Sequence, residues 1–267
     1  MCFIYSVYFI IDMITTNNKI KMFPRKIHTC WIGDKTMPKD LQECCDRWKT
    51  LNPSYEFIMW TNKEMEEMVP NEVKERINMF PNPSQRANIF RYWILYENGG
   101  IDVDTDMWPT KSIESFIDTI EKKHLEHGNT DNANICVVCN EEEGEKPFCS
   151  RGFIAATKHH EILKIAAYDN FADTKKKNPK YNDSQLTGPT HFGSVLSRID
   201  KEIWKCIHLP TRAFYPLSYR ECCKLKVHEV LKLAEKKGLI NDENIYGIHL
   251  WARSWRQHGN YLYNENK

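Results

Sequence analysis

The sequence has almost no net charge and no long apolar run, and each absence excludes a class of protein. Its 37 basic and 36 acidic side chains leave a formal net charge of +1, so nothing indicates a nucleic-acid partner. The apolar run at residues 1–11 is shorter than the roughly 20 residues of a membrane-spanning helix. A signal peptide would have basic residues before its apolar segment, and none precedes this run. We expect residues 1–22 to form an extension, either an added strand or a disordered segment, with a membrane-associating segment as the alternative.

Internal repeats are also absent, and the 10 cysteines form no zinc-binding pattern. Cys136 and Cys139 have the C-x-x-C spacing, but no second pair stands at the distance that a zinc ribbon needs. Because their surroundings are apolar, we interpret them as reduced thiols in a buried strand. Free thiols in this number favour a reducing compartment. We therefore predict a cytoplasmic protein, soluble or peripherally associated with a membrane.

Strand and helix patterns alternate along the chain after the extension. We predict strands at residues 26–33, 55–60, 133–139 and 152–156. We predict helices at residues 38–51, 84–98, 113–125, 161–171 and 220–238, and a further helix between the turn at 187–189 and residue 199. Thr61 and Glu64 have the spacing of a capping box at the start of a further short helix. The alternation predicts an α/β fold with a largely parallel sheet.

The most informative segment is 99–106, in which Asp102, Asp104 and Asp106 follow a pair of glycines. Because alternate residues of a strand point to the same side, we expect the three carboxylates to share one face. Three like charges repel one another unless a cation or hydrogen-bond donors offset them. A divalent metal ion that also binds a phosphate is the usual partner of such a cluster.

Other sites with alternating aspartates fit this segment less well. A calcium-binding EF-hand loop that starts at Asp102 would need Gly and Glu where the chain has Met107 and Ile113. An aspartyl-phosphate phosphotransferase would have Thr at the position of Asp106. An acidic surface turn without a ligand is the structural alternative. A metal–diphosphate site, with carboxylates at a strand end open to a ligand, fits the local pattern.

Segments along nearly the whole chain resemble a known family. Residues 91–106, RYWILYENGGIDVDTD, resemble the central block of DXD-motif glycosyltransferases. This group includes yeast initiating mannosyltransferases, capsular-polysaccharide sugar transferases and the sugar-transferring domains of large clostridial toxins. Residues 24–33, 48–60 and, near the end, 187–189 with 249–255 resemble further blocks of the family in the same order.

The chain departs from the family pattern at two places. Asp102 stands where the family usually has Tyr, so it could be an additional carboxylate rather than a metal ligand. Ala87 and Asn88 stand where the family often has Ser and Asp. Asn88 still donates and accepts hydrogen bonds but carries no charge. We expect these changes to affect donor preference or rate.

The resemblance implies a GT-A-type, Rossmann-like fold over residues 23–267, with a mixed, mostly parallel sheet flanked by helices. It also implies catalytic roles for Asp104, Asp106 and Arg91. Asp106 would be the first metal ligand, His249 a second, and Asp104 would orient donor hydroxyls and touch the metal. Arg91 would pair with the diphosphate or with Asp104. A core histidine and a surface ion pair are the structural alternatives for His249 and Arg91.

The same resemblance implies a set of donor-binding residues, in which Trp31 would stack on the base unless it is a core tryptophan. The residues of this set are Trp31, Ile32, Gly33, Asn88, Arg91, Asp104, Ser254 and Trp255. Ser254 and Trp255 would close over the diphosphate after the donor binds. The turn at 187–189 would line the sugar pocket.

The function implied is a glycosyltransferase that uses Mn²⁺ or Mg²⁺ and moves a sugar from a UDP- or GDP-sugar to a glycan or glycosylated acceptor, with retention of configuration. Because no side chain is assigned as a covalent nucleophile, we hypothesise that the departing phosphate takes the acceptor proton. Two alternatives stay open. One is a catalytically silent protein that binds nucleotides or glycans, and the other is a metal-dependent phosphohydrolase.

Overall fold

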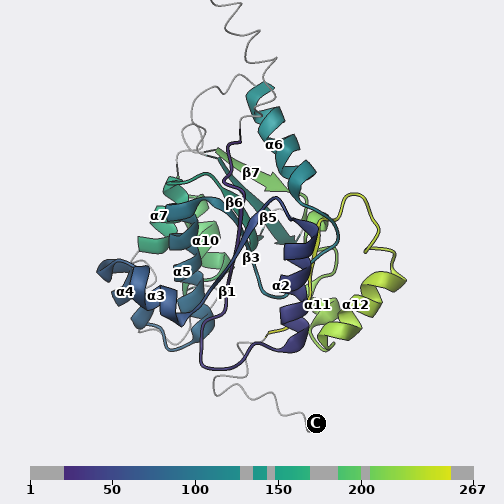
Figure 1. Ribbon diagram of the computed structural model, residues 1–267, viewed down its shortest axis with the longest axis horizontal. Coiled ribbons are helices and arrows are strands. Elements are labelled where there is room, and N and C mark those ends of the chain that lie inside the picture. Colours follow the sequence, from purple (N-terminus) through teal and green to yellow (C-terminus); the bar gives the residue numbers. More distant parts are fainter. Residues whose placement is uncertain (1–20, 127–134, 143–147, 169–185, 200–204, 254–267) are drawn as a thin grey trace, which may run out of the picture.

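A six-stranded sheet forms the middle layer of the protein, and helices cover both of its faces (Figure 1). The computed structural model describes residues 21–126, 135–142, 148–168, 186–199 and 205–253. The sheet has the order β2-β1-β3-β6-β5-β7, and a separate two-stranded sheet pairs β4 with β8. The strands are β1 (Lys26–Cys30), β2 (Glu56–Trp60), β3 (Gly100–Val103), β4 (Met107–Pro109), β5 (Ile135–Glu142), β6 (Phe148–Ala156), β7 (Lys205–Leu209) and β8 (Gly247–His249).

Strand β6 runs antiparallel to both of its neighbours, β3 and β5, whereas the other pairs in the six-stranded sheet are parallel. The predicted class, α/β with a mixed and mostly parallel sheet flanked by helices, is therefore confirmed. The helices are α2 (Lys39–Leu51), α3 (Asn62–Met68), α4 (Asn71–Asn78), α5 (Pro83–Asn98), α6 (Glu114–Glu126), α7 (Glu161–Tyr168), α10 (Pro189–Leu196), α11 (Tyr219–Cys222) and α12 (Val227–Lys236), with a 3-10 turn at Thr211–Ala213.

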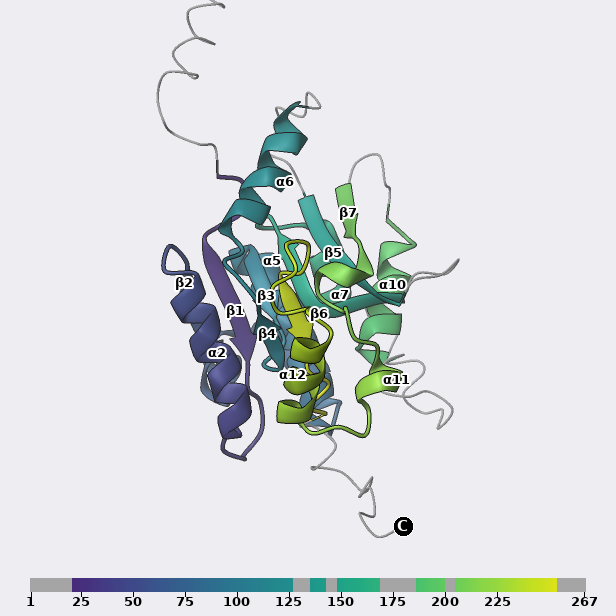
Figure 2. The ribbon, with the colours of Figure 1, turned by 90° about the vertical axis from the view of Figure 1, so that its right-hand side faces the viewer.

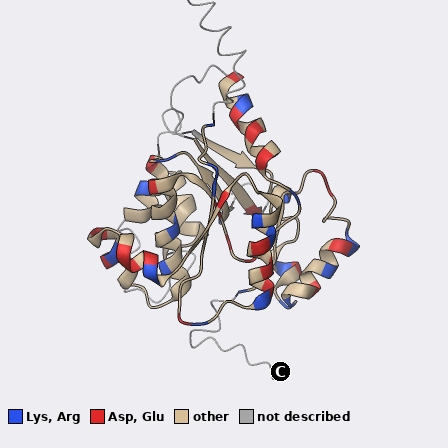
Figure 3. Ribbon diagram, viewed as in Figure 1, with Lys and Arg blue, Asp and Glu red and all other residues tan. Residues whose placement is uncertain are grey.

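Two hydrophobic clusters hold the layers together, one on each face of the sheet. The alternation along β5 shows the division: Val137 packs into the cluster with α2, α6 and α12, and Val138 packs into the cluster with α4, α5, α7 and α10. The small β4-β8 sheet belongs to the α2 and α12 side (Figure 2). Lys, Arg, Asp and Glu gather on the peripheral helices, and the strands carry few of them (Figure 3).

Helix α5 and its end position the aspartate run. Asn82 caps the helix by accepting a hydrogen bond from the backbone of Ser84, and Pro83 occupies the first turn. Gly99 ends the helix with φ 63°, and a Cβ there would lie 2.8 Å from the backbone nitrogen of Lys158. The chain therefore needs glycine at this point to turn directly from the helix into β3.

The sequence patterns located most elements, with one clear error. The helix predicted at 220–238 is two helices, because Ser218 and Glu221 cap α11 and Lys226 is extended, with ψ 159°, before α12 begins. Strands β4, β7 and β8 and helix α4 were not predicted. The predicted strand at 26–33 ends at Cys30, and the predicted helix at 161–171 is described only to Tyr168.

Cys136 and Cys139 are buried in β5, as expected for core thiols. Of the extension predicted at 1–22, only residues 21 and 22 are described. Within the described ranges, none of the helices combines the length and apolar character that crossing a membrane requires.

Candidate active site

Only the first part of the aspartate run lies in the sheet. Strand β3 ends at Val103, and Asp104 to Asp106 form a turn before β4. The backbone nitrogen of Asp104 donates to the carbonyl of Gly152 at 3.0 Å, and that of Met107 closes the turn on the carbonyl of Asp104 at 3.0 Å. The prediction of three carboxylates on one face of a strand is therefore wrong. Asp102 stays within the sheet, and the other two aspartates lie in the turn.

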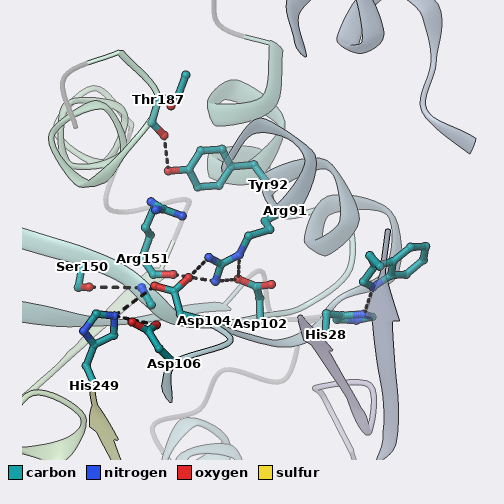
Figure 4. A network of polar contacts seen from close by, with 12 residues as sticks. His28, Arg91, Tyr92, Asp102, Asp104, Asp106, Ser150, Arg151, Thr187 and His249 are labelled. Carbon is teal, nitrogen blue, oxygen red and sulfur yellow. Dashed lines mark hydrogen bonds and ion pairs between the residues drawn. The ribbon is translucent and has the colours of Figure 1, made fainter. Parts of the chain in front are cut away.

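Asp102 holds Arg91, which projects from α5. The Nε of Arg91 donates to Asp102 at 2.5 Å, a terminal nitrogen bonds to Asp104, and the other donates to the carbonyl of Arg151 at 3.1 Å (Figure 4). Asp102 is 0% exposed and Arg91 is 6% exposed, so this is a buried pair rather than a surface one. Burial raises the pKa of Asp102 to about 6, although the charge of Arg91 opposes the shift.

Asp104, Asp106 and His249 converge at the open end of the run. The Nε2 of His249 lies 3.4 Å from Asp104 Oδ2 and 3.3 Å from Asp106 Oδ1. One ligand atom from each of the three side chains lies within 4.8 Å of the others. The β4-β8 pairing produces this arrangement, because Met107 is the register partner of His249.

Each carboxylate is fixed through one oxygen and faces the histidine with the other. Arg91 binds Asp104 Oδ1, and the backbone nitrogen of Ala252 donates to Asp106 Oδ2 at 2.8 Å. Hydrogen bonds of this kind orient the ligands in metal sites. Two carboxylate oxygens and one imidazole nitrogen are a donor set that suits Mn²⁺, so the residues present fit a divalent cation.

The electrostatics of the cluster agree with a site for positive charge. Burial alone would lower the pKa of His249, but Asp106 and Asp104 raise it to about 10. Burial opposes ionisation of Asp104, but the charge of Arg91 and the hydrogen bond from His249 hold its pKa well below the usual range. The imidazole is thus protonated between the two carboxylates, and a divalent cation would take the place of that proton.

Gly152 and Tyr215 are parts of the site that the sequence did not reveal. A Cβ on Gly152 would lie 2.5 Å from the hydroxyl of Tyr215 and 3.0 Å from Asp104 Oδ2. The Tyr215 hydroxyl bonds to Ser150, and its ring centre is 5.5 Å from that of His249. Glycine within a strand is a known sign of a close backbone approach, and this was the available signal.

A cavity of about 410 Å³ opens beside these groups. Its wall includes several predicted donor-binding residues as well as residues from β5, β6 and the 219–253 region. Besides the carboxylates and His249, the lining includes Trp31, Ile32, Ser84, Asn88, Arg91, Glu141, Arg151, Pro189, Tyr219, Trp251 and Arg253.

Trp31 is only half buried, so it is a wall residue rather than a core tryptophan. Gly33 does not line the cavity, and its backbone hydrogen-bonds to Asn62. Ser254 and Trp255 lie outside the described residues.

Asn88 connects the cavity to the 187–189 turn. Its amide nitrogen donates to the hydroxyl of Thr187 at 3.0 Å, and Tyr92 donates to the carbonyl of the same residue at 3.1 Å (Figure 4). Thr187 is buried behind this contact, whereas Pro189 reaches the cavity wall. The buried Oδ1 of Asn88 has no hydrogen-bond partner among the described residues. The turn therefore holds Asn88 with one buried acceptor left unpaired.

Part of the chain is similar to known proteins. Residues 38–126 match the family of glycosyltransferase sugar-binding regions containing the DXD motif. The chain is 27% identical over 107 residues to inositol phosphoceramide mannosyltransferase 3 of Schizosaccharomyces pombe, which covers 38% of this chain and 29% of that protein. It is 26% identical over 110 residues to the initiation-specific alpha-1,6-mannosyltransferase of Candida albicans, with the same two coverages, 38% and 29%.

Among solved structures, the PaToxG glycosyltransferase is similar over 84% of this chain and 78% of that chain, with a TM-score of 0.48 and 14% identity. The matches to the two fungal mannosyltransferases span less than a third of their length. The matched family region contains α5, Arg91 and the aspartate run, and the sheet that carries the run is mixed and mostly parallel, as the resemblance implied. Residues 38–126 of the chain are thus similar to the sugar-binding region of DXD-motif glycosyltransferases.

Proposed function

We propose that the protein is a metal-dependent glycosyltransferase that moves a sugar from a nucleotide-sugar donor to a hydroxyl of a glycan or glycosylated acceptor. The observation that carries the proposal is the convergence of Asp104, Asp106 and His249 beside a cavity with an aromatic wall. Mannose donors come first among the candidates, because both fungal relatives are named mannosyltransferases. The proposed donor is either a UDP-sugar or a GDP-sugar.

The metal would be held by Asp106, His249 and Asp104. Mn²⁺ or Mg²⁺, when bound there, offsets the negative charge that grows on the leaving diphosphate. Arg91 acts on the donor through Asp104, because its hydrogen bond fixes the orientation of that carboxylate. Asp104 is then positioned to bind donor hydroxyls as well as the metal.

The remaining roles follow from the cavity wall. Trp31 stacks on the base of the donor, with Ile32 beside it. Asn88 accepts a hydrogen bond from a sugar hydroxyl through its unpaired Oδ1.

The transfer retains the anomeric configuration in this proposal. The bond between the anomeric carbon and the phosphate oxygen breaks with its electrons on phosphate, the acceptor oxygen bonds to the same face, and the leaving phosphate takes the acceptor proton. Glu141 is a cavity carboxylate that the sequence did not single out. Mass-spectrometric detection of a sugar covalently attached to Glu141, or to another side chain, would replace this route with a double displacement.

The experiment is an assay of nucleoside diphosphate release. The protein is mixed with Mn²⁺ and a panel of UDP- and GDP-sugars, and Asp106→Ala is compared with Asp46→Ala, the same change at an exposed position on α2. We expect release with one donor, a loss of at least about a hundredfold in Asp106→Ala because a metal ligand is removed, and unchanged release in Asp46→Ala.

The other outcomes separate the alternatives. Donor binding without release would support a catalytically silent nucleotide- or glycan-binding protein. Phosphate release from simple phosphate esters would support a phosphohydrolase. Either result would overturn the transferase proposal.

A further inference from the structure

The cavity contains an arginine that has no place in the roles assigned so far. Arg151 lies on β6, and its side chain lines both the cavity and a small gap next to Asn88 and Asp102. Among the described residues its guanidinium forms no ion pair, and its buried Nε has no hydrogen-bond partner. In Figure 4 no dashed line joins this guanidinium to a carboxylate.

The charge of Arg91 is already balanced by carboxylates of the protein. Each of its three guanidinium nitrogens already donates a hydrogen bond, to Asp102, to Asp104 and to the carbonyl of Arg151. The guanidinium lies between the carboxylates of Asp102 and Asp104, and a phosphate bound there would also face their negative charges. Of the two partners that the resemblance implied for Arg91, the structure shows Asp104. Because the charge of Arg91 is balanced in this way, the diphosphate needs another cation.

The charges of the site lead to the same requirement. Three buried or half-buried carboxylates, those of Asp102, Asp104 and Asp106, belong to this group, and Arg91 is the guanidinium that forms ion pairs with two of them. A divalent cation would bring this group to neutrality. The diphosphate of a donor would then add negative charge that nothing in the group offsets, and this charge increases as the sugar leaves.

Arg151 is well placed to supply the missing charge. The carbonyl of Arg151 accepts from Arg91, and the carbonyl of the next residue, Gly152, accepts from the backbone of Asp104. The backbone of Arg151 is thereby fixed against the aspartate turn, while its side chain remains at the cavity wall. Guanidinium groups bind phosphate oxygens in a fixed, two-pronged geometry.

We propose that Arg151 is the phosphate-binding cation of the cavity: its guanidinium binds an oxygen of the donor diphosphate and stabilises the nucleoside diphosphate as it leaves. This inference rests on the proposed function and adds a substrate-binding residue to it. The bond changes stay those of the transfer above.

The test measures binding, so that it does not depend on an identified acceptor. UDP and GDP are titrated calorimetrically into the wild-type protein, Arg151→Gln and Arg151→Lys in the presence of Mn²⁺. Arg212→Gln is the matched control, since Arg212 is an exposed residue paired with Asp242 away from the cavity. The affinities of uridine and guanosine, measured by ligand-observed NMR, serve as the phosphate-free comparison.

We expect Arg151→Gln to weaken binding of the preferred nucleoside diphosphate by about ten- to a hundredfold, the value of a charge-assisted hydrogen bond. Arg151→Lys should lose less, because it keeps the charge. The control and the nucleoside affinities should not change.

Equal diphosphate binding by wild type and Arg151→Gln would overturn the inference and leave the proposed function standing. An equal loss of nucleoside and diphosphate affinity would show a structural role and would also overturn it. If the wild-type protein binds neither UDP nor GDP with Mn²⁺, the proposed function fails, and the inference fails with it.

Discussion

At the scale of single residues, the three aspartates of the run have different surroundings. Asp102 is fully buried against Arg91, whereas Asp104 and Asp106 face His249. The D-x-D spacing and the family resemblance predicted the second group. Spacing alone predicted the wrong place for Asp102, because it does not show where β3 stops pairing with β6. The carboxylate that replaces the usual tyrosine is used to hold Arg91.

Gly152 provides a sharp test at this scale. The change Gly152→Ala places a methyl group 2.5 Å from the Tyr215 hydroxyl, which must move, and 3.0 Å from Asp104 Oδ2, which must shift by a few tenths of an ångström. We expect Mn²⁺ affinity, measured by electron paramagnetic resonance, to fall by roughly ten- to a hundredfold, as for other groups that orient metal ligands. Gly193→Ala is the control, since no atom lies within 4 Å of its added Cβ. Wild-type Mn²⁺ affinity in Gly152→Ala would show that the carboxylate position does not matter.

At the scale of elements, the junction of β1, β2 and α5 positions the aspartate run. His28 on β1 accepts a hydrogen bond from the indole of Trp60 at 3.1 Å, and its other nitrogen lies 2.9 Å from the carbonyl of Gly99. The ring is therefore neutral, with its proton on Nε2. Sequence patterns predicted β1, β2 and α5 but gave no sign of this contact, because it joins residues that are 71 positions apart.

This junction predicts a pH dependence of stability. Burial lowers the pKa of His28 to about 4, against about 6.5 in the unfolded chain. The contribution of neutral His28 to the free energy of unfolding is complete above pH 6.5. It is lost as the pH falls toward 4, because His28 takes up a proton at a higher pH in the unfolded state than in the folded state. The loss amounts to about 3 kcal/mol from the difference in pKa. We expect the free energy of unfolding in urea to fall less steeply over this range in His28→Gln than in the wild type.

The exposed His228 on α12 gives the comparison. His228→Gln should retain the wild-type pH dependence of the free energy of unfolding. Parallel curves for wild type and His28→Gln between pH 6.5 and 4 would mean that the ring at position 28 does not control this dependence.

At the scale of the whole molecule, the sequence predicted the layers and much of the site but not its complete wall. Periodicity located α2, α5 and most of the strands, because their apolar faces pack on the sheet. Arg151, Glu141 and Gly152 were missed because they come from the strands β5 and β6, whose pairing brings them beside the turn. Their local sequence carries no motif. Long-range strand pairing is information that one sequence pattern does not contain.

The central claim is that Asp104, Asp106 and His249 together bind a divalent cation that also binds the donor diphosphate. The most direct measurement is a crystal structure of the protein with Mn²⁺ and a nucleoside diphosphate, with data collected for the anomalous signal of manganese. We expect one strong peak between these three side chains, with phosphate oxygens among the ligands. Nucleotide bound in the cavity without a peak at this position, or a peak held by other residues, would contradict it.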